Sequence, residues 1–88
     1  MPHHLFYHPG ISRDVSSLPA NIKNRIRRAI EERLATDSLR FGDPLKRSLR
    51  GYRKLRVGDY RVIYRIEKNN VVILKIGHRK EVYNKFGS

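Results

Sequence analysis

The sequence predicts one α+β domain, residues 1–88, in which an antiparallel sheet packs against a helical hairpin. Two patterns predict this class. Apolar residues recur at helical spacing in the first half of the chain, and three runs rich in β-branched and aromatic residues fill the second half. The expected order of elements is β-α-α-β-β-β with a short C-terminal segment. A single domain is expected, because a chain of 88 residues has no room for a second core.

The first elements are short. A strand is expected over residues 5–8, and Pro9-Gly10 ends it. A short helix is expected next, because the apolar residues there are four and three positions apart. These are Ile11, Val15 and Leu18. Ser12 can cap this helix.

A second helix follows almost without a linker. Pro19 suits its first turn, where a missing N–H costs nothing. The helix is expected to end near Asp37-Ser38, before a loop at Gly42-Asp43-Pro44. Its apolar residues form one stripe, which predicts packing on a sheet. The stripe consists of Ile22, Ile26, Ala29, Ile30 and Leu34.

Three strands are expected in the second half, over residues 52–57, 60–67 and 71–76. Gly58-Asp59 and Asn69-Asn70 separate them, and both pairs tolerate the positive φ that tight hairpins need. The run 71–74 is apolar at every position, which is typical of a central strand.

Strand periodicity sorts the side chains onto two faces. One face should pack on the helices, and the other should carry a column of cations beside aromatic groups. Tyr60, Val62, Tyr64 and Ile66 share a face of the middle strand, and Arg61, Ile63 and Arg65 share the opposite one. On the strand before, Tyr52, Lys54 and Arg56 alternate with Arg53, Leu55 and Val57.

The charge is strongly basic and uneven. The chain has a net charge of +12, of which residues 45–88 carry +10 and residues 1–44 carry +2. Solubility alone is the plain explanation. A polyanionic partner explains a one-sided excess better, because neutralising phosphates releases counterions and drives binding.

The composition excludes several classes of protein. With no cysteine, a disulfide scaffold, a zinc ribbon and a cysteine nucleophile are excluded. No acidic cluster could hold Mg²⁺, so neither a metal nor another cofactor is expected. No 18-residue apolar run predicts a membrane span, and residues 1–4 lack a secretory pattern, so a cytoplasmic location is expected.

Two motifs carry a family resemblance. Residues 44–46 and 49–64, followed by residues 76–83, resemble the RelE/ParE toxin superfamily, and Phe6-Tyr7-His8-Pro9 and Leu18-Pro19 also fit its element order. The resemblance implies a RelE-like fold and a toxin of a toxin–antitoxin pair. RelE-type toxins cut messenger RNA in the ribosomal decoding site without a metal, and their antitoxins bind them directly. ParE-type toxins instead poison DNA gyrase and generally lack the RNase residues.

The resemblance also implies site residues. Lys54 and Arg56 match basic positions before the hairpin, Arg61 matches an arginine after the hairpin tyrosine, and Arg79 and Tyr83 match positions in the last motif. His78 takes a position that varies among branches. The implied catalytic residues are Arg61, Arg79, Tyr83, Lys54 and His78, and the implied RNA-binding residues are Arg56, Arg53, Arg65, Lys46 and Arg50.

These side chains suit cleavage by the RNA's own 2′-oxygen. The reaction needs a base for the 2′-hydroxyl, cations on the pentavalent phosphate and a proton for the 5′-oxygen. Arg61, Lys54 and Arg56 could hold the phosphate. Tyr83 or His78 could take the proton, and Arg79 or His78 could assist the leaving group. Alternatively, Tyr83 only anchors the C-terminal segment, and Tyr52, Tyr60 and Tyr64 are expected to pack rather than react.

We therefore predict a ribosome-dependent, metal-independent endoribonuclease toxin. The alternatives are a ParE-like toxin that inhibits gyrase by contact alone and an inactive RNA-binding or autoregulatory module. The expected partners are the ribosome with its mRNA and a cognate antitoxin, acidic where it contacts the toxin, in a hetero-oligomeric complex. No membrane partner is expected.

Overall fold

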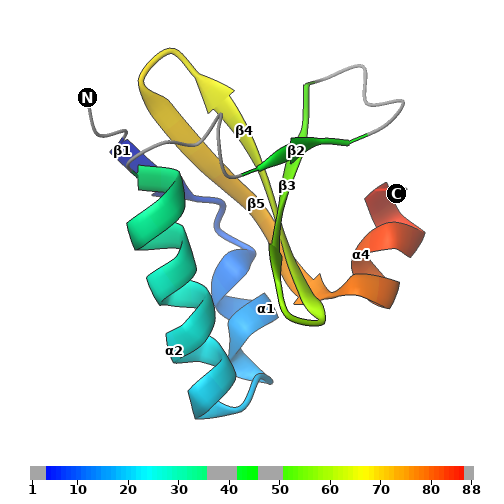
Figure 1. Cartoon of the computed structure of the whole chain (residues 1–88). Coiled ribbons are helices and arrows are strands. Elements are labelled where there is room, and N and C mark those ends of the chain that lie inside the picture. The colour runs from blue at the N-terminus through cyan, green and yellow to red at the C-terminus, as the bar shows by residue number, and fades with distance from the viewer. Residues whose placement is uncertain (1–3, 36–41, 46–50, 87–88) are drawn as a thin grey trace.

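In a computed structural model, residues 4–35, 42–45 and 51–86 are described. Two helices, α1 (Ile11–Ser16) and α2 (Ala20–Ala29), lie on one side of a five-stranded sheet, and α4 (Arg79–Phe86) lies on the other side (Figure 1). Within the described part of the chain, no helix is long and apolar enough to cross a membrane.

The first half follows the predicted pattern with local corrections. Strand β1 spans His4–Tyr7, and α2 continues into a π-helical turn, η1 (Ile30–Leu34). Ser12 is not the cap of α1, because Gly10 takes the N-cap position and no side chain bonds there. Pro19 is the N-cap of α2 and not part of its first turn. The predicted helix end at Asp37-Ser38 lies outside the described residues.

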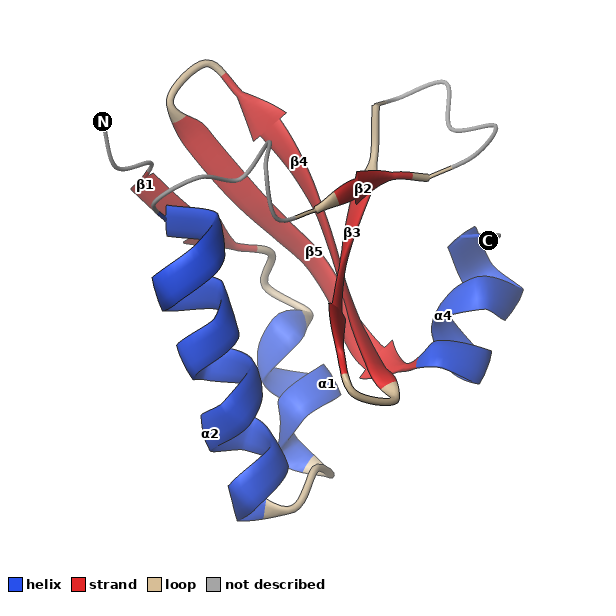
Figure 2. Ribbon diagram, in the orientation of Figure 1, coloured by secondary structure: helices blue, strands red, loops and turns tan. Residues whose placement is uncertain are grey.

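The second half contains the three predicted strands and two elements that were missed. The strands are β3 (Arg53–Val57), β4 (Tyr60–Glu67) and β5 (Asn70–His78) (Figure 2). Asp43–Pro44, predicted as loop, forms β2 and pairs with β3, and the C-terminal segment is the helix α4. In the hairpin turns, positive φ is found at Gly58 (61°), as predicted, and at Lys68 (55°) instead of an asparagine.

The sheet order is β1-β5-β4-β3-β2, so β5 is a central strand as its apolar run predicted. The meander β3-β4-β5 is antiparallel. Strand β1, however, pairs with β5 in parallel, which the expectation of a purely antiparallel sheet did not include. The long connection that a parallel pair requires is the chain from α1 to β4, which contains both helices and three strands.

The main core lies between the sheet and the α1–α2 hairpin. The predicted helix stripe is confirmed, because Ile26, Ala29, Ile30 and Leu34 are buried and Ile22 packs beside them. The predicted sheet face is confirmed as well. Its buried members are Leu55, Val57, Val62, Tyr64, Val71, Ile73 and Ile76.

A second, smaller core lies on the opposite face. Ile63 is fully buried there with Leu45 and Val82, and Tyr52 and Leu74 pack against them. The sequence had predicted cations and aromatic groups on this face but no buried cluster. Because Val82 belongs to α4, this cluster holds α4 against the face that carries the candidate site.

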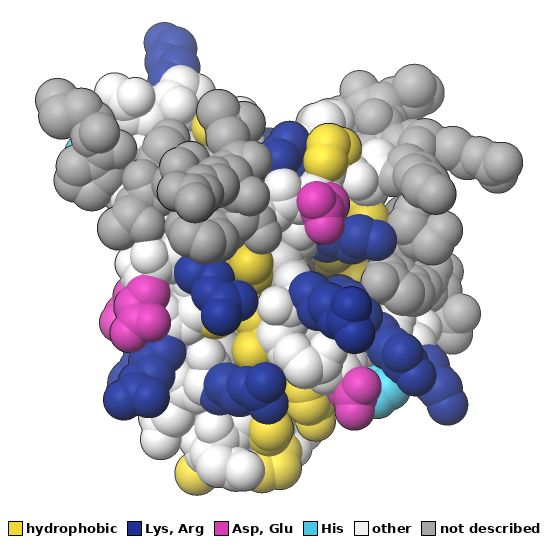
Figure 3. All heavy atoms as spheres, in the orientation of Figure 1, with side chains coloured by type: hydrophobic (Ala, Val, Ile, Leu, Met, Phe, Trp, Pro, Cys, Tyr) yellow, Lys and Arg dark blue, Asp and Glu magenta, His cyan; other side chains and the backbone are white. Residues whose placement is uncertain are grey.

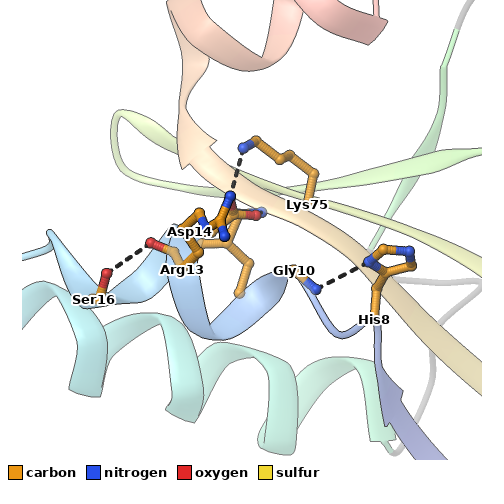
Figure 4. A network of polar contacts seen from close by, with 7 residues as sticks. His8, Gly10, Arg13, Asp14, Ser16 and Lys75 are labelled. Atoms are coloured by element: carbon orange, nitrogen blue, oxygen red, sulfur yellow. Dashed lines mark hydrogen bonds and ion pairs between the residues drawn. The ribbon is translucent and has the colours of Figure 1, made fainter.

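Helix α1 is fixed to β5 where β1 ends. Strand β1 pairs with β5 only as far as Ile73. Beyond that residue the Asp14 carboxylate accepts hydrogen bonds from the Ile76 N–H at 3.2 Å and from the Lys75 ammonium at 2.6 Å (Figure 4). An aspartate of α1 thus takes the place of a strand neighbour, beside the bulge that shifts the β4–β5 register.

Candidate active site

Two arginines face each other across β3 and β4. Arg56 and Arg61 are cross-strand partners, and Gly77 of β5 continues the same row. The row lies on the face opposite the α1–α2 hairpin, as strand periodicity predicted. Like charges placed directly opposite each other destabilise a sheet. A feature that works against the fold is expected mainly at functional sites, so the pair is the centre of the candidate active site.

Arg61 is buried and held in place. Only 6% of the Arg61 surface is exposed. Its Nη1 donates to the carbonyl oxygens of Gly58 at 2.8 Å and Tyr60 at 2.9 Å. A buried cation is tolerated where hydrogen bonds satisfy it. The tight turn at Gly58 therefore orients the Arg61 guanidinium.

Lys54 and Arg56 extend the cationic group along β3. They are two positions apart on the strand, so their side chains lie on one face, with a Cα separation of roughly 7 Å. Arg56 is exposed and Lys54 is half-buried. We refer to Lys54, Arg56 and Arg61 as the cation cluster.

Helix α4 begins beside this cluster. The Arg79 N–H donates to the Asp59 carbonyl oxygen at 2.9 Å, which ties the start of α4 to the β3–β4 turn. A Cβ added to Gly77 would lie 3.4 Å from both the Glu81 carboxylate and the Val82 side chain. Helix α4 therefore passes within contact distance of Gly77, the β5 residue in the row of arginines. Tyr83 follows Val82 in this helix.

His78 lies in the neighbouring row, on the other face. Its cross-strand partner is Tyr60, whose ring packs against the main core. The two rings meet edge to face, with centroids 5.8 Å apart. The His78 Nδ1 accepts a hydrogen bond from the Lys80 N–H at 3.3 Å, so a neutral imidazole carries its proton on Nε2. The structure thus does not bring His78 into the row of Arg56 and Arg61.

Arg53 lies on the helix-facing side and supports the fold. Its Nη2 donates to the Gly42 carbonyl oxygen at 2.7 Å, and it hydrogen-bonds the Tyr64 side chain. Burial raises the pKa of the Tyr64 phenol, and Arg53 opposes that shift. Arg53 is therefore separated by the sheet from the cation cluster with which the sequence grouped it.

The other predicted RNA-binding residues do not join the cluster. Arg65 shares the face of Arg61 but lies four residues further along β4, about 13 Å away. Its guanidinium pairs with Glu67 at 2.9 Å. Lys46 and Arg50 lie outside the described residues.

Several hollows lie on the described surface near the helices, and two of them bear on the candidate site. One of about 310 Å³ is apolar and lies on the α1–α2 side, away from the cation cluster. Tyr7 at its edge has a raised pKa because of burial and the nearby Glu31, against a smaller opposite effect of Arg27. Its lining includes Tyr7, Ile11, Val15, Ile26, Ile30 and Ile76.

The other hollow is a basic groove of about 210 Å³ between α2 and β3. Arg56 lines it together with Arg25, Arg28 and Arg33. Lys and Arg side chains gather over α2 and the neighbouring strands on this face of the molecule (Figure 3). These helical arginines were not predicted as site residues from the sequence, although Arg25 and Arg28 are three positions apart and so share one side of a helix.

Comparisons with known proteins agree with the fold. A family model described as the ParE toxin of the parDE type II toxin–antitoxin system matches residues 5–83. The chain is 36% identical over 87 residues to Toxin RelG of Mycobacterium tuberculosis, covering 97% of this chain and 100% of the relative. It is 32% identical over 84 residues to Toxin RelE of the same organism, covering 93% and 87%.

Solved structures agree as well. The toxin–antitoxin complex RelBE2 from Mycobacterium tuberculosis superposes with a TM-score of 0.82 at 34% identity, covering 90% of this chain and 93% of that one. The RelB–RelE complex from Methanococcus jannaschii gives a TM-score of 0.72 at 26% identity, covering 92% and 98%. The chain therefore belongs to the RelE/ParE superfamily of toxins from type II toxin–antitoxin systems.

Proposed function

We propose that this toxin is a RelE-type endoribonuclease that cleaves mRNA in the ribosomal A site without a metal ion. The observation that carries the proposal is the cross-strand pair of Arg56 and Arg61, with Lys54 on the same face and α4 packed beside it. Such a group of fixed cations suits a phosphate that gains negative charge in the transition state. The relatives named RelG and RelE favour this branch of the family.

The proposed reaction is transesterification within the RNA. The 2′-oxygen attacks the adjacent phosphorus while a base takes the 2′-proton. The bond from phosphorus to the 5′-oxygen then breaks, and that oxygen gains a proton. The products are a 2′,3′-cyclic phosphate and a 5′-hydroxyl, and no redox step or co-reactant is needed.

The cation cluster would stabilise the phosphorane. Arg61 is oriented by two carbonyl groups, so little reorganisation is needed when a phosphate arrives. Arg56 opposite it can hold a second phosphate oxygen, and Lys54 adds a point charge. The two arginines would then lose their mutual repulsion by sharing one anion.

The proton transfers are assigned to α4 and the end of β5. We assign Tyr83 as the base, because it belongs to α4, the helix whose Val82 packs on the face of the cation cluster. Arg79 would assist the leaving oxygen. His78 would act as a proton donor and not as the base, since its Nδ1 already accepts a hydrogen bond from the Lys80 N–H.

A cognate antitoxin is the second part of the proposal. The structural relatives include complexes of a toxin with its antitoxin. An acidic, disordered segment of the antitoxin would order on the cationic face and exclude RNA from it. If co-expressed neighbouring genes neither restored growth nor co-purified with this chain, the antitoxin proposal would be wrong.

Gyrase inhibition is the second candidate function, and the ParE family model that matches the chain favours it. Induction of the gene in cells separates the candidates. The RNase predicts translation arrest and new transcript 5′ ends at ribosome-bound codons, with intact DNA. Gyrase inhibition predicts DNA breaks and intact transcripts, and normal growth would indicate an inactive module. Lys23→Ala, on the apolar hollow, is a control that should behave as the unaltered toxin.

A further inference from the structure

The basic groove between α2 and β3 brings together arginines that are far apart in the sequence. Arg25 and Arg28 come from α2, Arg33 from η1 and Arg56 from β3. All four are exposed. Among the described residues of the lining, Glu32 is the one carboxylate against four arginines, so the groove has a positive potential.

The groove is continuous with the candidate active site. Arg56 lines the groove and is also the cross-strand partner of Arg61. The Gly58 turn is shared as well. Its carbonyl accepts from Arg61, and a Cβ on Gly58 would lie 3.2 Å from the Arg25 Nη1. Cations therefore flank both sides of one turn.

The groove and the active-site face meet at the edge of β3. Strand β2 pairs with β3 only at Arg53 and Lys54. In the described part of the chain, the remaining residues of β3, from Leu55 to Val57, have no strand on that side. Along this edge, no described strand therefore lies between the active-site face and the groove.

The chemistry of the lining indicates the ligand. Guanidinium groups match phosphate oxygens with paired hydrogen bonds. Of the described lining residues, only Ala29 and Val57 have apolar side chains, whereas protein partners dock through larger buried anchors. The apolar hollow on the α1–α2 side is lined by large apolar side chains of this kind, and the arginine groove is not.

We propose that the arginine groove binds the sugar–phosphate backbone of RNA, as an extension of the active site. The proposal rests on the proposed RNase function. The phosphates come either from the mRNA next to the cleaved bond or from ribosomal RNA around it. In both cases the groove contributes to binding more than to the chemical step.

A pair of double variants on one helix tests the proposal. The double variant Arg25→Glu with Arg28→Glu reverses the charge on the side of α2 that lines the groove. The double variant Lys23→Glu with Arg27→Glu makes the same change in charge at residues that line the apolar hollow. Binding is measured on ribosomes whose A-site mRNA carries a 2′-deoxy nucleotide at the attacked position, over a series of salt concentrations. Cleavage is measured on the ordinary mRNA.

The groove variant should weaken binding at least tenfold, since two phosphate contacts are lost, and should flatten the salt dependence of log K by about 1.5. It should raise KM more than it lowers kcat. The Lys23/Arg27 variant should leave both within about twofold. Equal effects of the two variants, or no effect of either, would overturn the proposal.

Further measurements distinguish mRNA from ribosomal RNA as the source of the phosphates, and distinguish failure of this proposal from failure of the proposed RNase function. A defect on isolated single-stranded RNA as well as on ribosomes assigns the groove to mRNA, and a defect on ribosomes alone assigns it to ribosomal RNA. A groove variant that loses only affinity for the antitoxin would contradict the proposal. If the unaltered toxin does not cut RNA, the proposed function itself fails. Arg28→Glu alone, with its unfolding midpoint, controls for loss of fold.

Discussion

At the scale of single residues, Arg61 is a buried arginine to which the proposed mechanism gives a role in the transition state. Arg61 lies almost out of contact with water, and two turn carbonyls orient it. A side chain of this kind contributes to the hairpin and, in the proposed mechanism, to the transition state. The two contributions predict separate effects of one substitution.

Arg61→Ala should lower the single-turnover cleavage rate by about 10²- to 10³-fold, because a fixed electrostatic donor is lost. Binding to programmed ribosomes should fall much less, since a transition-state contact acts on kcat. Thermal unfolding of the variant shows how much of the loss comes from the hairpin. Lys23→Ala serves as the control cation outside the site. A variant cutting at the normal rate would remove Arg61 from the mechanism.

Gly42 is a second position where one residue decides the packing. A Cβ there would overlap the ring and hydroxyl of Tyr64, which is fully buried. Gly42→Ala should therefore lower the free energy of unfolding by about 1–3 kcal/mol, as overpacking does. Gly10→Ala is the matched control, because its Cβ would meet only His8 at an ordinary 3.5 Å. Equal unfolding midpoints of the two variants in urea would contradict this prediction.

At the scale of elements, the docking of α1 on β5 depends on one partly buried ion pair. The side chains of Asp14 and Lys75 are 12% and 24% exposed, and Asp14 also accepts from the Ile76 N–H. The pair joins α1 to the central strand, beside the bulge.

Asp14→Ala should lower the free energy of unfolding by about 2 kcal/mol, because a backbone N–H and an ammonium lose their acceptor. The control is Glu67→Ala, which breaks the Arg65–Glu67 pair. Those side chains are 37% and 52% exposed, so the expected loss is at most about 1 kcal/mol. Denaturant titrations compare the two variants, and an equal loss in both would show that burial of the Asp14 pair does not matter.

Local patterns predicted the elements that have a clear period. The stripe of α2 and the alternation along β4 are set by burial on one face, so they can be read from neighbouring residues. Strand β2 has only two residues and no period, and the parallel pairing of β1 with β5 joins distant segments. Neither leaves a local signal.

Some residues of the candidate site could likewise be predicted from local patterns, and others depend on tertiary packing. Periodicity correctly placed Lys54 with Arg56 on one face of β3 and Arg61 on the face of β4 opposite Tyr60, because a strand alternates strictly. The register of the two strands then brings Arg61 to the face of Lys54 and Arg56. Periodicity also separated Arg53 from them, although the family pattern had grouped the residues. The groove arginines of α2 could not be assigned from sequence, since only tertiary packing brings that helix beside β3.

At the scale of the whole molecule, charge is arranged by the fold rather than by position in the chain. The first half has a net charge of only +2, yet it supplies three of the four groove arginines. They join Arg56 of the second half in the groove, and Lys and Arg side chains gather over α2 and the neighbouring strands on this face (Figure 3). In the proposed function, this surface holds RNA on both sides of the β3 edge.

The most direct test of the account is the chemistry of the cut ends. Purified toxin is added to ribosomes programmed with mRNA, and the ends of the fragments are analysed. A parallel reaction uses mRNA with a 2′-deoxy nucleotide at the attacked position. We predict 5′-hydroxyl and 2′,3′-cyclic phosphate ends, or the derived 3′-phosphate, and no cleavage of the deoxy substrate. Fragments with 5′-phosphate ends, or cleavage of the deoxy substrate, would contradict attack by the 2′-oxygen at the cation cluster.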